Sequence, residues 1–299
     1  GDACLRAALA LKKQGYTPEV IAAHPGWGES LFLKEVWPEA KLKLYCEFFY
    51  HASGFDVGFD PEYQSSDPAD AGRVTLKNAN MLLQFQQADA GISPTHWQAS
   101  TFPPHIQEKI TVIHDGIDTE VLRPNPSVRF KLDNGQALSR DDEVITFVNR
   151  ALEPYRGFHV FMRSLPKLLA AKPHAQVLIV GKEGVSYGAQ PPSGKSWKTQ
   201  FCDEVMPQLT AQQRDRIHFL GNIEYARFIS LIQVSRVHVY LTYPFVLSWS
   251  LLEAMSVGCS IVASDTQPLH EAIKHEETGK LVDFFDPAAL ADSVIGLLE

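Results

Sequence analysis

One carboxylate near the start of a predicted helix is the first candidate for chemistry in this chain. Residues 249–257 are largely apolar without glycine or proline, Ser248 before them is a typical N-cap, and Gly258 is a typical helix end. The free N–H groups and positive dipole at the start of such a helix bind diphosphates. Glu253 would then reach ribose hydroxyls, although a buried helix with one solvated glutamate explains this segment alone equally well.

Two arginines supply positive charge elsewhere. Residues 144–148 form an apolar, strand-like run, and Arg150 and Arg156 lie in the loop between it and a helical segment. Guanidinium groups stay charged and donate paired hydrogen bonds to phosphate oxygens. Most surface arginines are merely solvated. Together with Glu253, however, the pair predicts a divided site for a nucleoside diphosphate.

Alternating short strands and helices carry these residues. Helical segments at residues 158–171 and 226–235 separate strand-like runs at residues 144–148, 177–181, 217–221, 237–242 and 259–264. This alternation predicts an α/β fold with a parallel sheet covered on both faces and ligands at the carboxyl ends of its strands. Pro166 predicts a kink or a split in the first helix. Residues 186–198 read as a long loop over the edge of the site, either functional or merely structural.

The N-terminal part has its own candidates. Residues 19–23 and 42–49 are predicted strands; His24 and Trp27 follow the first, Glu47 lies within the second and His51 comes after it. Histidine and carboxylate side chains can do acid–base chemistry, and a tryptophan can stack on a sugar face. A satisfied structural histidine and a core tryptophan are the competing interpretations.

These motifs together resemble the retaining glycosyltransferases of family 4, whose GT-B fold consists of two Rossmann-like parallel-sheet domains facing a cleft. Arg150, Arg156 and Gly157 fit that family's two cations before a helix that starts at glycine. Residues 252–258 fit its Leu-Glu-Ala-Met-x-x-Gly run, and residues 112–119 are similar to the segment that ends its first domain. Relative to the family, the N-terminal opening strand and the C-terminal crossover helices are expected to be missing.

The resemblance implies a function and a set of site residues. It implies metal-independent transfer of a sugar, with retention, from a nucleoside-diphosphate sugar to a glycan or lipid-linked acceptor, without another cofactor. The implied donor-binding residues are Arg150, Arg156, Leu247, Ser248, Trp249, Ser250 and Glu253. The implied catalytic residues are Arg150, Arg156, His51 and Glu47, with His24 and Trp27 on the acceptor or sugar side.

One position departs from the family pattern, which has a second glutamate eight residues before Glu253. Phe245 stands there. Backbone groups of residues 246–248 then replace the missing contact to the donor sugar, or the sugar is recognised differently, or turnover is weakened. A binding module that has lost turnover therefore stays open as an alternative, and a sugar-nucleotide epimerase is a further one that lacks an assignable acid–base pair.

Composition limits the remaining possibilities. The length of 299 residues suggests two domains, expected at residues 1–125 and 143–299 with a linker at residues 126–142. With 27 basic and 35 acidic residues the net charge is −8, so nucleic acid is not an expected partner. No His or Cys cluster has the spacing of metal ligands.

Four widely spaced cysteines and the absence of an 18-residue apolar run favour a cytoplasmic protein. Residues 5–13 are amphipathic and basic, which is compatible with peripheral contact to the inner face of a membrane, although a solvated helix explains them as well. An incomplete N-terminal sheet would leave an edge that favours a homodimer.

Overall fold

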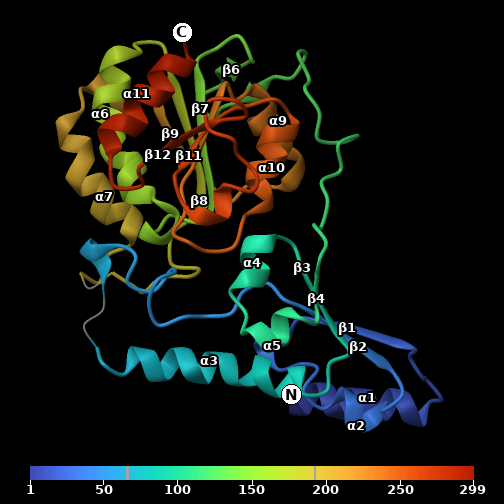
Figure 1. Ribbon diagram of the computed structural model, residues 1–299. Helices are drawn as coiled ribbons and strands as arrows, with labels where there is room; N and C mark the ends of the chain where they lie inside the picture. The colour runs from blue at the N-terminus through green and yellow to red at the C-terminus, as the bar shows by residue number, and fades with distance from the viewer. Residues whose placement is uncertain (65–66, 192) are drawn as a thin grey trace. The chain divides into compact units, whose positions relative to one another are not determined.

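The computed structural model describes residues 1–64, 67–191 and 193–299. The chain separates into two compact units. The first contains Gly1–Gly116 with Pro244–Val246, and the second contains Ile117–Tyr243 with Leu247–Glu299. Each unit has its own parallel sheet (Figure 1), as predicted.

The first unit is built on a four-stranded sheet in the order β1-β2-β3-β4, in which every pairing is parallel. The strands are β1 (Val20–Ala23), β2 (Lys41–Tyr45), β3 (Ala90–Ser93) and β4 (Ile110–Val112). The helices are α1 (Asp2–Lys13), α2 (Leu33–Val36), α3 (Asp70–Phe85), α4 (His96–Ser100) and α5 (Pro104–Gln107), with short 3₁₀ turns η1 (Pro25–Trp27) and η2 (Pro61–Tyr63).

Alternation along β2 shows why this strand forms. Leu42 and Leu44 are buried while the lysines between and before them point away from the core. Phe85 of α3 and Phe102 pack in the same core cluster. The strand ends at Tyr45, earlier than the predicted residue 49, so Glu47 lies in the segment that follows the strand.

The second unit contains a six-stranded sheet in the order β12-β11-β10-β7-β8-β9, also fully parallel. The strands are β7 (Val144–Ala151), β8 (Gln176–Lys182), β9 (Ile217–Gly221), β10 (Val237–Tyr240), β11 (Ser260–Ser264) and β12 (Lys280–Val282). A small antiparallel hairpin of β5 (Phe130–Lys131) and β6 (Ala137–Leu138) precedes the sheet.

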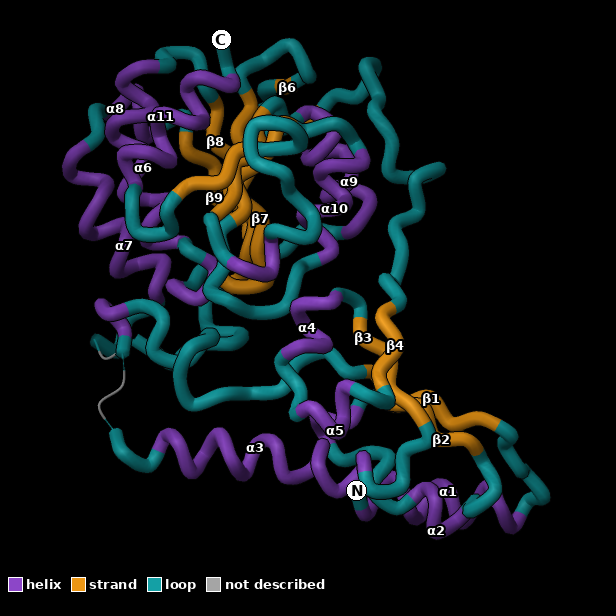
Figure 2. Tube along the Cα trace, in the orientation of Figure 1, coloured by secondary structure: helices purple, strands orange, loops and turns teal. Residues whose placement is uncertain are grey.

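Helices cover both faces of the six-stranded sheet. Figures 1 and 2 show α6, α7 and α11 on one side, and α9 and α10 on the other. The helices are α6 (Phe158–Ala171), α7 (Trp197–Val205), α8 (Ala211–Arg214), α9 (Tyr225–Val234), α10 (Trp249–Ser256) and α11 (Pro287–Leu297), with 3₁₀ turns η3 (Pro154–Arg156), η4 (Met206–Gln208) and η5 (Gln267–Leu269). Coverage on both faces explains why the strands are continuous apolar runs.

A split of α6 at Pro166 does not occur: the helix runs without interruption from Phe158 to Ala171. Its apolar face supplies the reason. Phe161 stacks on Phe147 of β7 with ring centroids 4.4 Å apart, and Leu165 and Leu168 are fully buried. Burial of this face outweighs the single hydrogen bond that proline removes.

The strand order of the second sheet reverses between β7 and β10. Strands β7, β8 and β9 run outward on one side of this point, and β10, β11 and β12 on the other. In open parallel sheets, the connections on either side of such a reversal separate and leave a crevice at the carboxyl ends of the strands. The loops after β7 and β10 are therefore where a ligand site is expected.

Gly157 lets the loop after β7 pass close to β10. Its φ of 68° is in the left-handed region, and a Cβ at this position would lie 2.4 Å from Cβ of Leu241. Only glycine fits, so η3 can end and α6 can begin directly against the end of β10.

Candidate functional site

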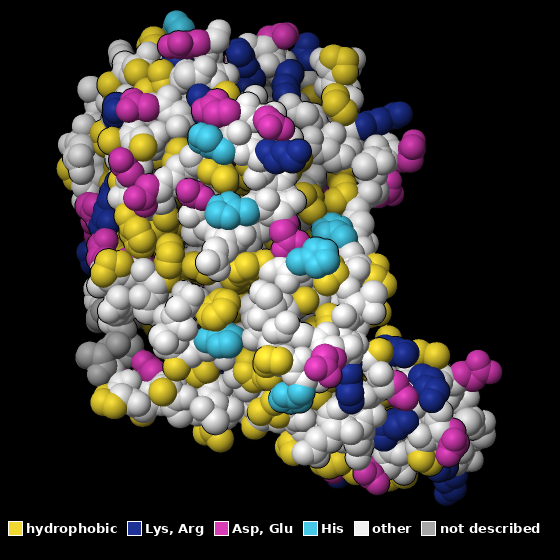
Figure 3. Space-filling model, in the orientation of Figure 1, with side chains coloured by type: hydrophobic (Ala, Val, Ile, Leu, Met, Phe, Trp, Pro, Cys, Tyr) yellow, Lys and Arg dark blue, Asp and Glu magenta, His cyan; other side chains and the backbone are white. Residues whose placement is uncertain are grey.

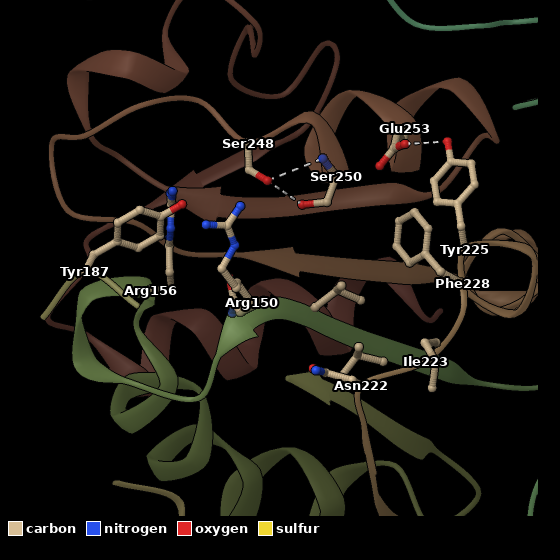
Figure 4. A pocket seen from close by; sticks show the side chains of 13 residues that line it. Arg150, Arg156, Tyr187, Asn222, Ile223, Tyr225, Phe228, Ser248, Ser250 and Glu253 are labelled. Atoms are coloured by element: carbon tan, nitrogen blue, oxygen red, sulfur yellow. Dashed lines mark hydrogen bonds between the residues drawn. The ribbon is translucent and has the colours of Figure 1, made fainter. Parts of the chain in front are cut away.

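A cavity of about 450 Å³ lies in the second unit, beside the ends of β7 and β8 and the start of α10 (Figure 4). One part of its lining is cationic and hydroxylated, and the other combines a carboxylate with aromatic and aliphatic side chains. The lining residues are Val148, Asn149, Arg150, Arg156, Val180, Tyr187, Asn222, Ile223, Tyr225, Phe228, Ser248, Ser250 and Glu253.

Two arginines reach the cavity from the connection between β7 and α6. Arg150 is an exposed residue near the end of β7, whereas Arg156 ends η3 and is 5% exposed. A guanidinium nitrogen of Arg156 donates to Oη of Tyr240 at 3.0 Å and to Oγ1 of Thr242 at 2.7 Å. Burial opposes the charge of Arg156, but Tyr240, Tyr187 and Tyr155 outweigh it and raise the pKa of Arg156. A permanently charged, fixed cation therefore faces the cavity.

Tyr240 joins this cation to the start of α10. Its hydroxyl also accepts a hydrogen bond from the backbone N–H of Ser248, at 2.9 Å. Ser248 is the N-cap of α10 and accepts from the N–H of Ser250, and the two serine hydroxyls are 2.9 Å apart. The amino end of α10 thus opens onto the cavity beside Arg156, which adds its dipole to the positive field.

Glu253 occupies the other part of the cavity. It lies on the second turn of α10 and is 9% exposed. The hydroxyl of Tyr225, the first residue of α9, donates to Oε1 of Glu253 at 2.7 Å. Burial and this hydrogen bond raise the pKa of Tyr225 to about 12, so its proton stays in place at neutral pH. Phe228 lies beside Tyr225 (Figure 4), and Ile223 also lines the cavity.

The arrangement suits a ligand with two unlike ends. The arginines and the dipole of α10 can neutralise a diphosphate, and the buried carboxylate can accept hydrogen bonds from vicinal hydroxyls. A flat apolar group would find Phe228 and Ile223 nearby. A nucleoside diphosphate has all three of these groups: the diphosphate, the vicinal hydroxyls of the ribose and the flat base.

The structure brings five of the predicted site residues together at this cavity: Arg150, Arg156, Ser248, Ser250 and Glu253. Two others are not among its lining residues. Leu247 packs against the core of the second unit, and Trp249 is 59% exposed at the first turn of α10. Successive residues at a helix start point in different directions around the helix axis, and the motif alone does not show which of these directions faces the ligand.

Tyr187, Tyr225 and Tyr240 contribute to the site without having been predicted. Tyr240 ends an apolar strand and Tyr225 begins a helix next to the loop after β9. Both could have been noticed in the sequence as tyrosines at positions that face a ligand in such folds: Tyr240 at the carboxyl end of a strand, and Tyr225 at the start of the helix that follows a strand. Tyr187 lies in the segment predicted as a loop over the site, of which residue 192 lies outside the described residues.

In the first unit, His24 and Glu47 come together, with Nε2 3.2 Å from Oε2. Both side chains are partly exposed, and Nδ1 of His24 accepts from the N–H of Gly26. Because Nδ1 is an acceptor, Nε2 carries the proton and donates to Glu47. His24 therefore orients the carboxylate rather than serving as a free base.

The other two N-terminal candidates have different surroundings. His51 stacks on Phe55 with ring centroids 4.2 Å apart, and its Nε2 is 2.7 Å from the carbonyl oxygen of Thr101. His51 takes no part in the hydrogen bond between His24 and Glu47. Trp27, in η1, is 77% exposed. Trp27 is therefore not a core residue, which was the competing interpretation for it.

Phe245, at the position where the family pattern has glutamate, is not a lining residue of the cavity. Phe245 is in the segment Pro244–Val246, which belongs to the first unit. The ring is buried and lies edge-on to Phe48 of that unit, with centroids 4.9 Å apart. Its role within the first unit is apolar packing.

No group of three or more His, Cys, Asp or Glu side chains in the part of the chain that the structure describes is arranged to hold a metal ion. No helix among residues 1–64, 67–191 and 193–299 has both the length and the apolar character needed to cross a membrane. On the face drawn in Figure 3, basic and acidic side chains are interspersed.

Comparison with protein families gives two matches that together cover most of the chain. Residues 1–122 match the model described as "Glycosyl transferase family 4 group". Residues 128–299, which include every residue that lines the cavity, match the model described as "Glycosyl transferases group 1".

Two curated relatives illustrate the sequence similarity. A phosphatidyl-myo-inositol mannosyltransferase of Mycolicibacterium smegmatis is 29% identical over 164 residues, which is 54% of this chain and 37% of the relative. A D-inositol 3-phosphate glycosyltransferase of Corynebacterium efficiens is 26% identical over 229 residues, which is 75% of this chain and 49% of the relative. The chain thus spans half or less of the length of these relatives.

Solved structures match nearly the whole chain. Anabaena HepE in complex with UDP-glucose has a TM-score of 0.67 at 16% identity, covering 99% of this chain and 72% of HepE. TarM has a TM-score of 0.65 at 14% identity, covering 97% of this chain and 50% of TarM. At these identities the likeness concerns the fold, and it confirms the predicted GT-B-like architecture.

Proposed function

Because the chain belongs to the glycosyl transferases group 1 family, we propose that it transfers a hexosyl group from a nucleoside-diphosphate sugar to a glycan or lipid-linked acceptor. The observation that carries the proposal is the joint position of Arg156, Glu253 and the amino end of α10 around one cavity. Retention of the anomeric configuration and independence of metal ions belong to the same proposal and rest on the resemblance to family 4.

The proposed role of the cationic part is to stabilise the leaving group. As the bond between the anomeric carbon and the phosphate oxygen breaks, negative charge develops on the diphosphate. Arg150 and Arg156 line the cavity beside the start of α10, whose dipole adds to their positive field, and Tyr240 joins Arg156 to the first turn of that helix. Donors that are oriented before the reaction lower its barrier without further reorganisation.

The proposed role of Glu253 is to bind the ribose. Its carboxylate has one oxygen engaged by Tyr225, and the remaining lone pairs can accept from ribose hydroxyls. This interaction uses binding energy far from the reacting bond to position it. No carboxylate nucleophile is assigned, so we favour front-face attack: the acceptor oxygen bonds to the anomeric carbon as the bond to the diphosphate breaks, and the departing diphosphate oxygen takes the hydroxyl proton.

The acceptor side is proposed to involve the first unit. The oriented carboxylate of Glu47 and the exposed ring of Trp27 are groups that bind sugar hydroxyls and sugar faces. The curated relatives are named for transfer to phosphatidyl-myo-inositol and inositol phosphate. An inositol-containing or lipid-linked acceptor is therefore the first class to test.

Calorimetric titration tests the donor site directly. The protein is titrated with UDP, GDP and ADP and with their hexose conjugates in buffer containing a metal chelator. The proposal expects one base to bind in preference to the others. Absence of binding to all of them would remove the proposed donor site.

Substitutions of the arginines sharpen this test. Replacing Arg150 or Arg156 by alanine should weaken diphosphate binding roughly tenfold or more, since each removes a charge-assisted hydrogen bond. Arg163→Ala is the matched control, because Arg163 pairs with Glu204 on α7 and does not line the cavity. Equal affinities of all three variants and the parent would contradict the assignment.

The alternative is a module that binds the nucleotide sugar without turnover. Phe245, which replaces a glutamate of the family pattern and does not line the cavity, favours this alternative. Release of free nucleoside diphosphate from the bound donor, measured with an acceptor mixture, distinguishes the two. Binding without release would establish the binding module.

A further inference from the structure

A buried carboxylate to which the proposed function gives no role lies between the two cavity arginines. Glu153 precedes η3 and is fully buried (0% exposed). Its carboxylate oxygens accept hydrogen bonds from the backbone N–H groups of three consecutive residues at 3.0–3.2 Å. The donors are Ser186, Tyr187 and Gly188. Burial of an ionised group is tolerated only with such donors, so this contact is specific rather than incidental.

Gly188 shows how closely the two segments approach. A Cβ at this position would lie 3.2 Å from Oε2 of Glu153, which is tighter than an ordinary contact. The segment from residue 186 to 188, here called the tyrosine loop, thus lies directly on the carboxylate. The charge of Glu153 is met by backbone dipoles of the tyrosine loop.

The tyrosine loop carries an aromatic ring to the cavity arginines. The ring centroid of Tyr187 is 5.2 Å from Cζ of Arg156 and 5.9 Å from Cζ of Arg150, within the range of cation–π attraction. On its other side Tyr187 contacts Tyr155, with centroids 5.6 Å apart. Figure 4 shows Tyr187 beside the two arginines at the cavity.

We propose that Glu153 is a positioning residue of the donor site: it holds the tyrosine loop so that Tyr187 covers the guanidinium groups that bind the diphosphate. The proposal rests on the proposed function. Glu153 lies in the sequence between Arg150, near the end of β7, and Arg156, the last residue of η3, so one buried charge links the cation-bearing segment to the loop that covers it. The ring limits the freedom of the guanidinium groups and excludes water from one side of them, which makes them oriented donors before the ligand arrives.

The first arm of the test needs no ligand. Amide hydrogen exchange is followed at residues 186–188 in the parent and in Glu153→Gln, which removes the charge while keeping the shape. Loss of bonds to a charged acceptor should accelerate exchange of these amides roughly tenfold or more. Glu183→Gln is the matched control: this exposed glutamate follows β8 and contacts Ser196 and Lys198, and its substitution should leave those three amides unchanged.

The second arm measures affinity for the nucleoside diphosphate that binds the parent best. Glu153→Gln should bind it roughly tenfold more weakly, again with Glu183→Gln as the control. Unchanged exchange in Glu153→Gln would overturn the hydrogen-bonding claim. Accelerated exchange with unchanged affinity would overturn the positioning role, because the contact would then serve structure alone.

Tyr187→Ala keeps the test decisive if Glu153→Gln fails to fold. This variant retains the backbone donors, so slow exchange at residues 186 and 188 should persist while affinity falls. Unchanged affinity in Tyr187→Ala would overturn the proposal. If the parent itself binds no nucleoside diphosphate, the proposed function fails and the positioning role fails with it, whereas the exchange arm still reports on the contact of Glu153 alone.

Discussion

At the scale of single residues, Glu253 is the group whose role can be isolated best. Its carboxylate is buried, has one neighbouring donor in Tyr225, and lies away from the arginines in the part of the cavity lined by Phe228. Glu253→Gln should weaken binding of the preferred nucleoside diphosphate by ~1–3 kcal/mol, the range for a hydrogen bond to a charged group. Titration calorimetry with the ribonucleotide measures this loss.

A 2′,3′-dideoxy analogue supplies the internal control for this prediction. Without ribose hydroxyls, it should bind the parent and Glu253→Gln with nearly equal affinity. Glu224→Gln is the control for charge, since Glu224 is an exposed neighbour of Tyr225 that does not line the cavity. An equal loss for the ribose and dideoxy ligands would show that Glu253 acts on something other than the ribose hydroxyls.

The charged residues that line the cavity were named from the sequence, whereas the tyrosines that contact them were not. Arg150, Arg156 and Glu253 stand in short motifs whose spacing carries chemical information. Tyr240 could not be assigned a role, because its contacts with Arg156 and with the N–H of Ser248 depend on the pairing of β10 with β7. Such contacts join residues far apart in the chain, and a single sequence contains no record of them.

At the scale of elements, β10 contains a titratable group in the middle of the sheet. His238 is fully buried, and its Nδ1 is 2.8 Å from Oγ1 of Thr146 on β7. Its Nε2 has no hydrogen-bond partner among the described residues. Burial lowers the pKa of His238 from 6.5 to about 4. The folded protein therefore binds this proton less readily than the unfolded chain does.

The pH dependence of stability follows from that difference. The contribution of His238 is constant above pH 6.5, and stability is lost as the pH falls from there toward about 4, because the unfolded state takes up the proton first. The loss attributable to this residue should reach roughly 3 kcal/mol. Urea unfolding at several pH values should show a smaller acid loss in His238→Gln than in the parent. The exposed His174→Gln serves as control, and a variant slope equal to the parent's would refute the prediction.

Elements were predicted best where local pattern and tertiary packing agree. The apolar runs of β7 and β8 are strands because helices cover both faces of their sheet. Of the two outcomes predicted at Pro166, a split does not occur, because burial of α6 against β7 outweighs a local preference. Local sequence reports propensities, whereas the packing that overrides them is set by distant segments.

At the scale of the whole molecule, the two units have separate apolar cores. Leu42, Leu44 and Phe102 belong to the core cluster of the first unit. The connecting segment from residue 117 onward packs on the second, where Leu122 is buried in the core and its carbonyl oxygen accepts from Oγ of Ser256. Residues 123–127 are rich in proline and polar side chains, which is typical of a linker. The sequence therefore does not show to which unit Leu122 belongs, whereas its contacts with the second unit do.

Separate cores predict that damage to one unit spares the ligand site of the other. Leu44 is fully buried in the first unit, and Leu231 of α9 is fully buried in the second. Either leucine-to-alanine substitution should cost ~2–5 kcal/mol of unfolding free energy in its own unit. Amide hydrogen exchange should localise the increased opening to the first unit for Leu44→Ala and to the second unit for Leu231→Ala. Since all lining residues of the cavity belong to the second unit, Leu44→Ala should retain nucleoside diphosphate affinity at low temperature while Leu231→Ala loses it. Loss of affinity in Leu44→Ala, with exchange in the second unit unchanged, would mean that the first unit contributes to the donor site.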